Sequence, residues 1–135
     1  MTMRVDRLRI EMSRLAHARL GIRDTLAFVE DGDFLREFTE NGLDDEDLQN
    51  IQTVITVCPT RGEVVPVSKH VRDIIYYTDA DDSVVIRYAY LRPSTVLLLM
   101  AYSGNESLHM TLEEAEEADA YIEHQINIFS KRCTR

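Results

Sequence analysis

The residues of this chain whose types could do chemistry are cationic and aromatic, and they lie between positions 69 and 102. Arginine and lysine side chains can contact phosphate, and a histidine can act as a general acid or base because it titrates near neutrality. Tyrosine rings can stack on exposed nucleic-acid bases. The residues concerned are Lys69, His70, Arg72, Arg87, Tyr88, Tyr90, Arg92 and Tyr102.

Each of these residues also has an ordinary structural role open to it. Arg72 and Arg87 could be strand-face arginines that pair with nearby carboxylates. The carboxylates at hand are Asp73, Asp79 and Glu106. The tyrosines could be half-buried aromatics of a sheet, and the histidine could be a solvated loop residue. Residue types alone leave both interpretations open.

The charge of the chain is divided unevenly along its length. The 135 residues carry a formal net charge of −9, yet residues 1–23 hold six arginines against two acids, a local charge of +4. The remaining 112 residues hold nine bases against 22 acids, a charge of −13. A body of that sign repels phosphate backbones and offers no affinity through counterion release, so composition argues against nucleic-acid binding.

The cysteines and histidines predict neither a disulfide framework nor a metal site. Cys58 and Cys133 are far apart, and His109 and His124 are separated from each other and from both cysteines. We expect Cys58 to be a small core residue of a reduced, cytoplasmic protein without cofactors. No stretch approaches the roughly 18 apolar residues of a membrane span, and residues 1–22 lack the apolar region of a secretory signal, so no membrane association is expected.

The N-terminal segment has the pattern of an amphipathic helix over residues 2–20. Val5, Leu8, Met12, Leu15 and Leu20 recur near the helical spacing, and the arginines occupy the other face. We therefore expect an arginine-rich helical extension, residues 1–23, ahead of one domain, residues 24–130. This helix could pack on its own acidic domain, bind a partner, pair two copies into a homodimer, or fill a groove as a built-in inhibitor.

The first part of the domain reads as a strand followed by a helical hairpin. Residues 25–29 are β-prone, and residues 34–38 form a helical stripe that stops at Asn41-Gly42. Asp44 is suited to cap a second helix, because carboxylates favour the positive end of a helix dipole. Pro59 ends that helix.

The second part reads as a three-stranded meander and a final helix. The segments 71–77, 84–91 and 95–102 are rich in β-branched and aromatic residues and are joined by short turns. Thr111-Leu-Glu-Glu114 is a capping box that opens the final helix. Its inward positions are expected to be Ala115, Ala118, Ile122, Ile126 and Phe129, and its outward positions Glu113, Glu114, Glu116, Glu117 and Asp119. The order predicts an α+β fold, with helices on a small, mostly antiparallel sheet of about four strands.

Several segments of residues 26–128, about three quarters of the chain, resemble the RelE/HigB toxins of bacterial toxin–antitoxin modules, in the same order and at similar intervals. The matching segments are Phe28-Val-Glu30, Phe34-Leu-Arg-Glu-Phe38, Leu43-Asp-Asp-Glu-Asp-Leu48, the Pro59-x-x-Gly62 turn with Val64-Val65-Pro66, the tyrosine-bearing strand, and Ala101-Tyr-Ser-Gly-Asn-Glu106. This resemblance implies a curved RelE-like sheet with an α-hairpin and a C-terminal helix. The arginine-rich extension lies outside it.

The resemblance also implies metal-independent cleavage of messenger RNA on the ribosome, in which clustered cations hold the phosphate while a 2′-hydroxyl attacks. The residues it places in such a site are Lys69, His70, Arg72, Arg87 and Tyr102. Three cations of the family pattern are replaced, because Asp73 and Gly104 stand where the family has lysines and Ile75 stands where it has an arginine.

Two functions therefore remain open from the sequence. The first is a toxin, an mRNA endoribonuclease that acts with the ribosome and is held in check by an antitoxin. The second is a catalytically degenerate RelE-fold protein that binds a protein partner or regulates it. The three lost cations favour the second, since one lost contact of this kind costs about 3 kcal/mol of transition-state stabilisation.

Overall fold

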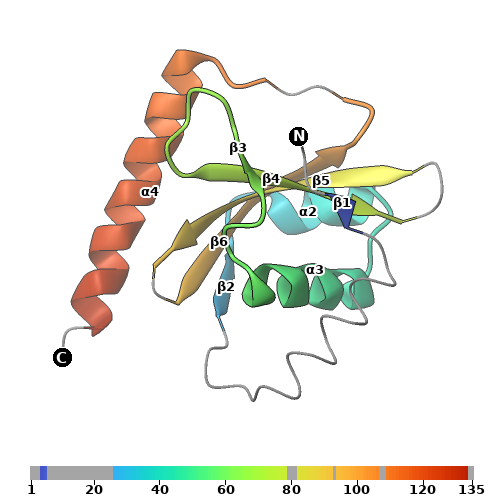
Figure 1. The fold of residues 1–135 in the computed structure, drawn as a ribbon, viewed down its shortest axis with the longest axis horizontal. Coiled ribbons are helices and arrows are strands. Elements are labelled where there is room, and N and C mark those ends of the chain that lie inside the picture. Colours follow the sequence, from blue (N-terminus) through green and yellow to red (C-terminus); the bar gives the residue numbers. More distant parts are fainter. Residues whose placement is uncertain (1–3, 6–25, 79–81, 93, 107–108, 134–135) are drawn as a thin grey trace.

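The fold of the chain, seen in a computed structural model, is a single sheet with helices on both of its faces (Figure 1). The structure describes residues 4–5, 26–78, 82–92, 94–106 and 109–133, and of residues 4–5 and 129–133 it describes the backbone alone. The elements are β1 (Arg4–Val5), β2 (Ala27–Glu30), α2 (Phe34–Glu40), α3 (Asp45–Val57), β3 (Glu63–Val64), β4 (Val71–Tyr77), β5 (Ser83–Leu91), β6 (Thr95–Ser103) and α4 (Leu112–Cys133). The predicted α+β class is confirmed.

The sheet is mostly antiparallel and is built around the predicted meander. Its strands follow the order β1-β4-β5-β6-β2. The short strand β3 stands outside this order and also pairs with β4. β4, β5 and β6 are antiparallel neighbours, whereas β2 runs parallel to β6 and β1 runs parallel to β4. β6 thus lies inside the sheet, which explains why its sequence is apolar on both faces.

Each face of the sheet has its own apolar core, because alternate residues of a strand point to opposite sides. On one face Ile74, Tyr76, Ile86 and Leu98 pack with residues of α2 and α3. On the other face the strand residues, together with Val65, pack against Ile122 of α4; these are Val71, Ala89, Leu91 and Leu97. Figure 1 shows α4 on one side of the sheet and the α2–α3 hairpin on the other.

The capped start of α3 is confirmed and also serves the core. Asp44 accepts a hydrogen bond from the Asp47 amide at 2.9 Å, and Asp47 accepts one from the Asp44 amide at 3.1 Å. The second oxygen of the buried Asp47 carboxylate accepts the Tyr76 hydroxyl at 2.6 Å. One carboxylate therefore closes the helix end and fixes the helix to β4.

Two predictions of local structure are wrong. Arg4 and Val5 were expected in a helix, but they form β1, opposite Ile75 and Tyr76 at the edge of β4. Pairing with an open strand edge outweighs a local helical pattern, because it satisfies backbone groups that β4 would otherwise expose. The rest of the predicted helix lies outside the described residues. The sheet has six strands in the described part, and not about four, because β1 and β3 add to it.

Cys58 is also placed differently from expectation. It was expected in the core, yet it is only half-buried and follows the last turn of α3 as its C-cap. Its amide donates to the Val54 carbonyl at 3.3 Å. None of the helices in the described part of the chain has the length and apolar character needed to cross a membrane.

Candidate functional site

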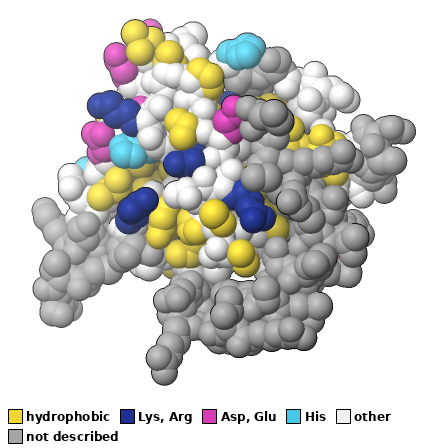
Figure 2. All heavy atoms as spheres, in the orientation of Figure 1, with side chains coloured by type: hydrophobic (Ala, Val, Ile, Leu, Met, Phe, Trp, Pro, Cys, Tyr) yellow, Lys and Arg dark blue, Asp and Glu magenta, His cyan; other side chains and the backbone are white. Residues whose placement is uncertain are grey.

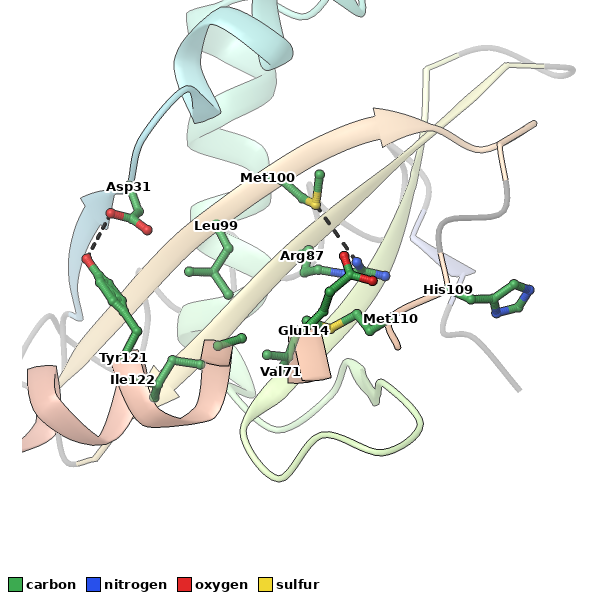
Figure 3. A pocket seen from close by; sticks show the side chains of 11 residues that line it. Asp31, Val71, Arg87, Leu99, Met100, His109, Met110, Glu114, Tyr121 and Ile122 are labelled. Carbon is green, nitrogen blue, oxygen red and sulfur yellow. Dashed lines mark hydrogen bonds between the residues drawn. The ribbon is translucent and has the colours of Figure 1, made fainter. Parts of the chain in front are cut away.

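Two adjoining pockets lie on the sheet face that α4 covers, and together we call them the groove. The first, the apolar pocket, has a volume of about 350 Å³, and the second, the acidic pocket, has a volume of about 290 Å³. The apolar pocket is lined by Asp31, Val71, Arg87, Leu99, Met100, His109, Met110, Glu114, Ala118, Tyr121 and Ile122 (Figure 3). The acidic pocket is lined by Glu63, Val64, Val65, Pro66, Asp73, Arg87, Tyr102, Glu106, His109 and Met110.

A β-bulge in β6 shapes the floor of the apolar pocket. Arg87 of β5 lies opposite Met100, but the next residue, Tyr88, lies opposite Leu98, so Leu99 has no partner of its own in β5. A bulge of this kind re-aims side chains that strict alternation would send to opposite faces. As a result, Leu99 and Met100 both line the apolar pocket.

Arg87 is held at the junction of the two pockets by a charged network. Asp73 of β4 lies directly opposite Arg87 in the β4–β5 ladder. The Arg87 Nε donates to Asp73 Oδ1 at 2.9 Å, and its Nη2 donates to Asp73 Oδ2 at 3.0 Å. The Tyr102 hydroxyl donates to the same Oδ2 at 3.1 Å, and the guanidinium lies over the Tyr102 ring. Arg87 is only 7% exposed and Asp73 17% exposed, so water screens this pair weakly.

The ionisation of the network follows from its burial and its charges. Burial by itself lowers the pKa of the Arg87 guanidinium, but the hydrogen bonds and the negative charge of Asp73 raise it by more, so its pKa shifts upward. Burial, joined by the charge of Asp73, raises the pKa of the Tyr102 phenol to about 12. Arg87 is therefore a fixed cation whose charge is already matched, and Tyr102 is a proton donor at neutral pH.

Arg72 belongs to the other face of the sheet. Its Nη1 donates to the carbonyls of Gly62 at 2.7 Å and Thr60 at 3.0 Å. Tyr88, opposite Arg72 in β5, holds the same loop, because its hydroxyl donates to the Pro59 carbonyl and accepts the Gly62 amide, both at 2.9 Å. Arg72 therefore fastens the loop after α3 to the sheet and lies away from Arg87.

Lys69 and His70 belong to a loop that is fastened to α4. The Lys69 amide, the His70 amide and the Ser68 hydroxyl all donate to the Asp119 carboxylate, at 2.9, 3.1 and 2.8 Å. The His70 Nε2 lies 3.2 Å from Glu123 Oε1. The expected outward position of Asp119 is wrong, because this carboxylate is only 8% exposed and satisfies the backbone of a turn in which Val67 has a φ of 64°.

Gly104, which stands where the resemblance has a lysine, leaves little room for a side chain. A Cβ built there would collide with the Ser83 hydroxyl and lie 3.2 Å from the Ser83 carbonyl oxygen. The Gly104 amide donates to that same carbonyl at 2.8 Å. The tight contact between this turn and the start of β5 thus disfavours a side chain at this position.

Of the five residues predicted for a site, the structure therefore brings together only Arg87 and Tyr102. Lys69 and His70 lie beside α4, and Arg72 lies on the opposite face. Asp79, one expected partner of the arginines, is outside the described residues. Within the described ranges no three histidine, cysteine or carboxylate side chains are grouped to hold a metal ion.

Among the groove residues that sequence reasoning missed are Glu63, His109, Met110 and Glu114. The signal available for Glu63 was its position in the sequence shortly before the strand that starts at Val71. In the structure β3 pairs with β4, and this pairing sets Glu63 opposite Asp73. Glu114 was recognised only as half of the capping box, which is confirmed by hydrogen bonds of 3.1 Å between Thr111 and Glu114 in both directions. Its carboxylate also lines the apolar pocket beside Arg87 (Figure 3).

The contact of Asp119 with the 68–70 loop predicts a marked loss of stability in Asp119→Ala. Removal of the carboxylate leaves two amides and a hydroxyl without their acceptor, so the free energy of unfolding should fall by about 2–3 kcal/mol in urea denaturation. Glu117→Ala, on the exposed side of the same helix, is the control and should change it by less than about 0.5 kcal/mol. Equal losses in the two variants would contradict the assigned role.

The Tyr102 phenol should titrate at about pH 12, against about 10 for an unperturbed tyrosine. Because the folded state keeps this proton longer than the unfolded state, the stability that it contributes is complete below about pH 10 and is lost as the pH rises towards 12. Tyrosinate absorbance of the wild type minus that of Tyr102→Phe isolates this group. A difference curve centred near pH 10 would show that the phenol is not buried beside Asp73.

Comparison with known proteins gives no family for this chain. No protein-family model matches it, and no curated protein matches it in sequence. Its function is therefore inferred from the ordered segments that resemble the RelE/HigB toxins and from the geometry of the groove.

Proposed function

We propose that this chain is a RelE/HigB-like protein that binds a protein partner and does not cleave messenger RNA. The fold supports the first half of this proposal. A strand, a helical hairpin, a three-stranded antiparallel meander and a C-terminal helix follow one another as β2, α2, α3, β4, β5, β6 and α4. This is the order that the resemblance implies.

The observation that carries the second half is the pairing of Arg87 with Asp73. A nuclease of the kind implied by the resemblance needs cations that are free to meet a phosphate. Arg87 instead donates from Nε and Nη2 to both oxygens of Asp73. Moving this guanidinium to a phosphate would leave the Asp73 carboxylate buried without its counterion, which costs several kcal/mol.

The other predicted cations do not replace it. Arg72 donates to two loop carbonyls on the far face, and Lys69 belongs to the loop beside α4 and does not line the groove. In Figure 2 the lysine and arginine side chains of the visible face appear as separate patches between hydrophobic and acidic ones. Among the described residues of that view no continuous basic surface suited to an RNA strand is present.

A ribosome-dependent nuclease is the second candidate, and one observation favours it. Arg87, Tyr102 and His109 line one pocket, which also contains the carboxylates Glu63 and Glu106. A histidine and a carboxylate are the groups that general acid–base chemistry uses. Among the described residues the pocket nevertheless offers one arginine or lysine, Arg87, and Asp73 already neutralises it.

Regulated expression in a bacterium should separate the two functions. We expect the wild-type chain to cause no growth arrest and no codon-linked cuts in messenger RNA, because Arg87, the one arginine or lysine among the described residues of the groove, is already paired with Asp73. The matched control is His109→Ala, an exposed residue of the same pocket that is not part of the buried pair, which should behave like the wild type. Growth arrest by the wild type that His109→Ala abolishes would overturn the proposal in favour of the nuclease.

The binding half of the proposal is tested by purification from cells that carry the protein naturally. A protein in fixed ratio with the chain, such as an antitoxin, is the expected result. The chain recovered as a clean monomer under mild conditions would contradict a binding function.

A further inference from the structure

We propose, resting on the binding function above, that the groove receives a segment of the partner protein in which an apolar side chain stands close to a lysine or arginine. The apolar pocket takes the apolar side chain, and the acidic pocket takes the cation. The partner is thus defined by its chemistry, as a basic and apolar peptide segment.

The apolar pocket has the size and lining for a large hydrophobic side chain. A cavity of about 150 Å³ holds a benzene molecule, and this pocket has about 350 Å³. Its apolar lining comes from the sheet, as Val71, Leu99 and Met100, and from α4, as Ala118 and Ile122. Figure 3 shows Met100 and Met110 beside the same space. Methionines adapt to the shape of what they contact, and they are common on surfaces that accept peptides.

The charge around the groove selects a cationic neighbour for that side chain. Five carboxylates line the two pockets against a single guanidinium among the described residues, and they are Asp31, Glu63, Asp73, Glu106 and Glu114. Because Asp73 neutralises the guanidinium, the carboxylates of Asp31, Glu106 and Glu114 give the groove a negative potential among the described residues. Such a potential attracts lysine and arginine, slows the approach of phosphate backbones and sets the register of a docking segment.

The two pockets are close enough for one segment to fill both. They share three lining residues, Arg87, His109 and Met110. In an extended segment, alternate side chains point to the same side and lie about 7 Å apart. An apolar residue and a basic residue separated by one position can therefore enter neighbouring pockets. The apolar surface of the groove extends to Val64, which lines the acidic pocket and is 40% exposed.

Titration of the full chain, labelled with ¹³C at its methionine methyl groups, tests the proposal directly. The probe is an acetylated and amidated peptide, Ser-Leu-Ser-Lys-Ser-Leu-Ser-Lys, and the control peptide has glutamate in place of each lysine. The lysine peptide should shift the Met100 and Met110 signals in a saturable way, and the glutamate peptide should bind at least about tenfold more weakly. No shift with the lysine peptide, or equal binding of both peptides, would overturn the proposal.

Variants of the chain locate the binding within the groove. Ala118→Leu narrows the apolar pocket and should abolish the shifts. Glu106→Gln leaves that pocket unchanged and should weaken binding of the lysine peptide by roughly threefold to fivefold. Glu46→Gln, an exposed residue of α3 on the other face, is the matched control and should bind like the wild type. Undiminished binding by Glu106→Gln would contradict the proposal.

The same variants keep this inference separate from the proposed function. If a natural partner co-purifies with the wild type and equally with the groove variants, the chain binds proteins but through another surface. In that outcome the groove inference is wrong and the binding function stands. If peptide binding is groove-dependent and no natural partner exists, the binding function fails while the groove chemistry holds.

Discussion

Asp73 and Arg87 stand opposite each other on neighbouring strands, and the character of the whole groove depends on their contact. With a lysine at position 73, as in the resemblance, the two side chains would repel each other and leave positive charge facing α4. With an aspartate, the guanidinium is bound along its Nε–Nη2 edge by both carboxylate oxygens. Compared with the family pattern that the chain resembles, an aspartate at position 73 would remove one cation and also neutralise a second one, Arg87.

The energetics of burial explain why this arrangement is fixed. Arg87 and Asp73 have little contact with water, so leaving either charge without the other inside the protein would be costly. Tyr102 supplies a further donor to Asp73, and the Met100 sulfur lies 3.8 Å from the Arg87 Nη1. Such a network is costly to open because every member would lose a partner at once. The pair therefore gives Arg87 a structural role, whereas the resemblance would give it a catalytic one.

Local patterns in the sequence predicted the elements that depend on local causes. The strand over residues 71–77 and the capped start at Asp44 are confirmed, because β-branched runs and capping side chains act over a few residues. β1 was not predicted, since two residues become a strand only by meeting the edge of β4. The bulge at Leu99 left no signal either, because it arises from register between two apolar strands.

The candidate site was predicted in part, and the missed part depends on tertiary contacts. Arg87 and Tyr102 do lie in one pocket. Lys69 and Arg72 have the right residue types, but strand alternation and the contact with α4 place them elsewhere. Asp119 was expected among outward-facing acids, and only the fold reveals the loop amides that it accepts. Charge and spacing in a sequence indicate which groups are present, and the fold decides which of them are already bound.

A double-mutant cycle on Asp73 and Arg87 tests the central claim most directly. The free energies of unfolding of the wild type, Asp73→Asn, Arg87→Met and the double variant are measured by urea denaturation. The account predicts that the single losses are not additive and that the coupling energy is about 2 kcal/mol or more, as for a buried pair. A coupling energy below about 0.5 kcal/mol, as for an exposed pair, would contradict it and leave Arg87 free to meet a phosphate.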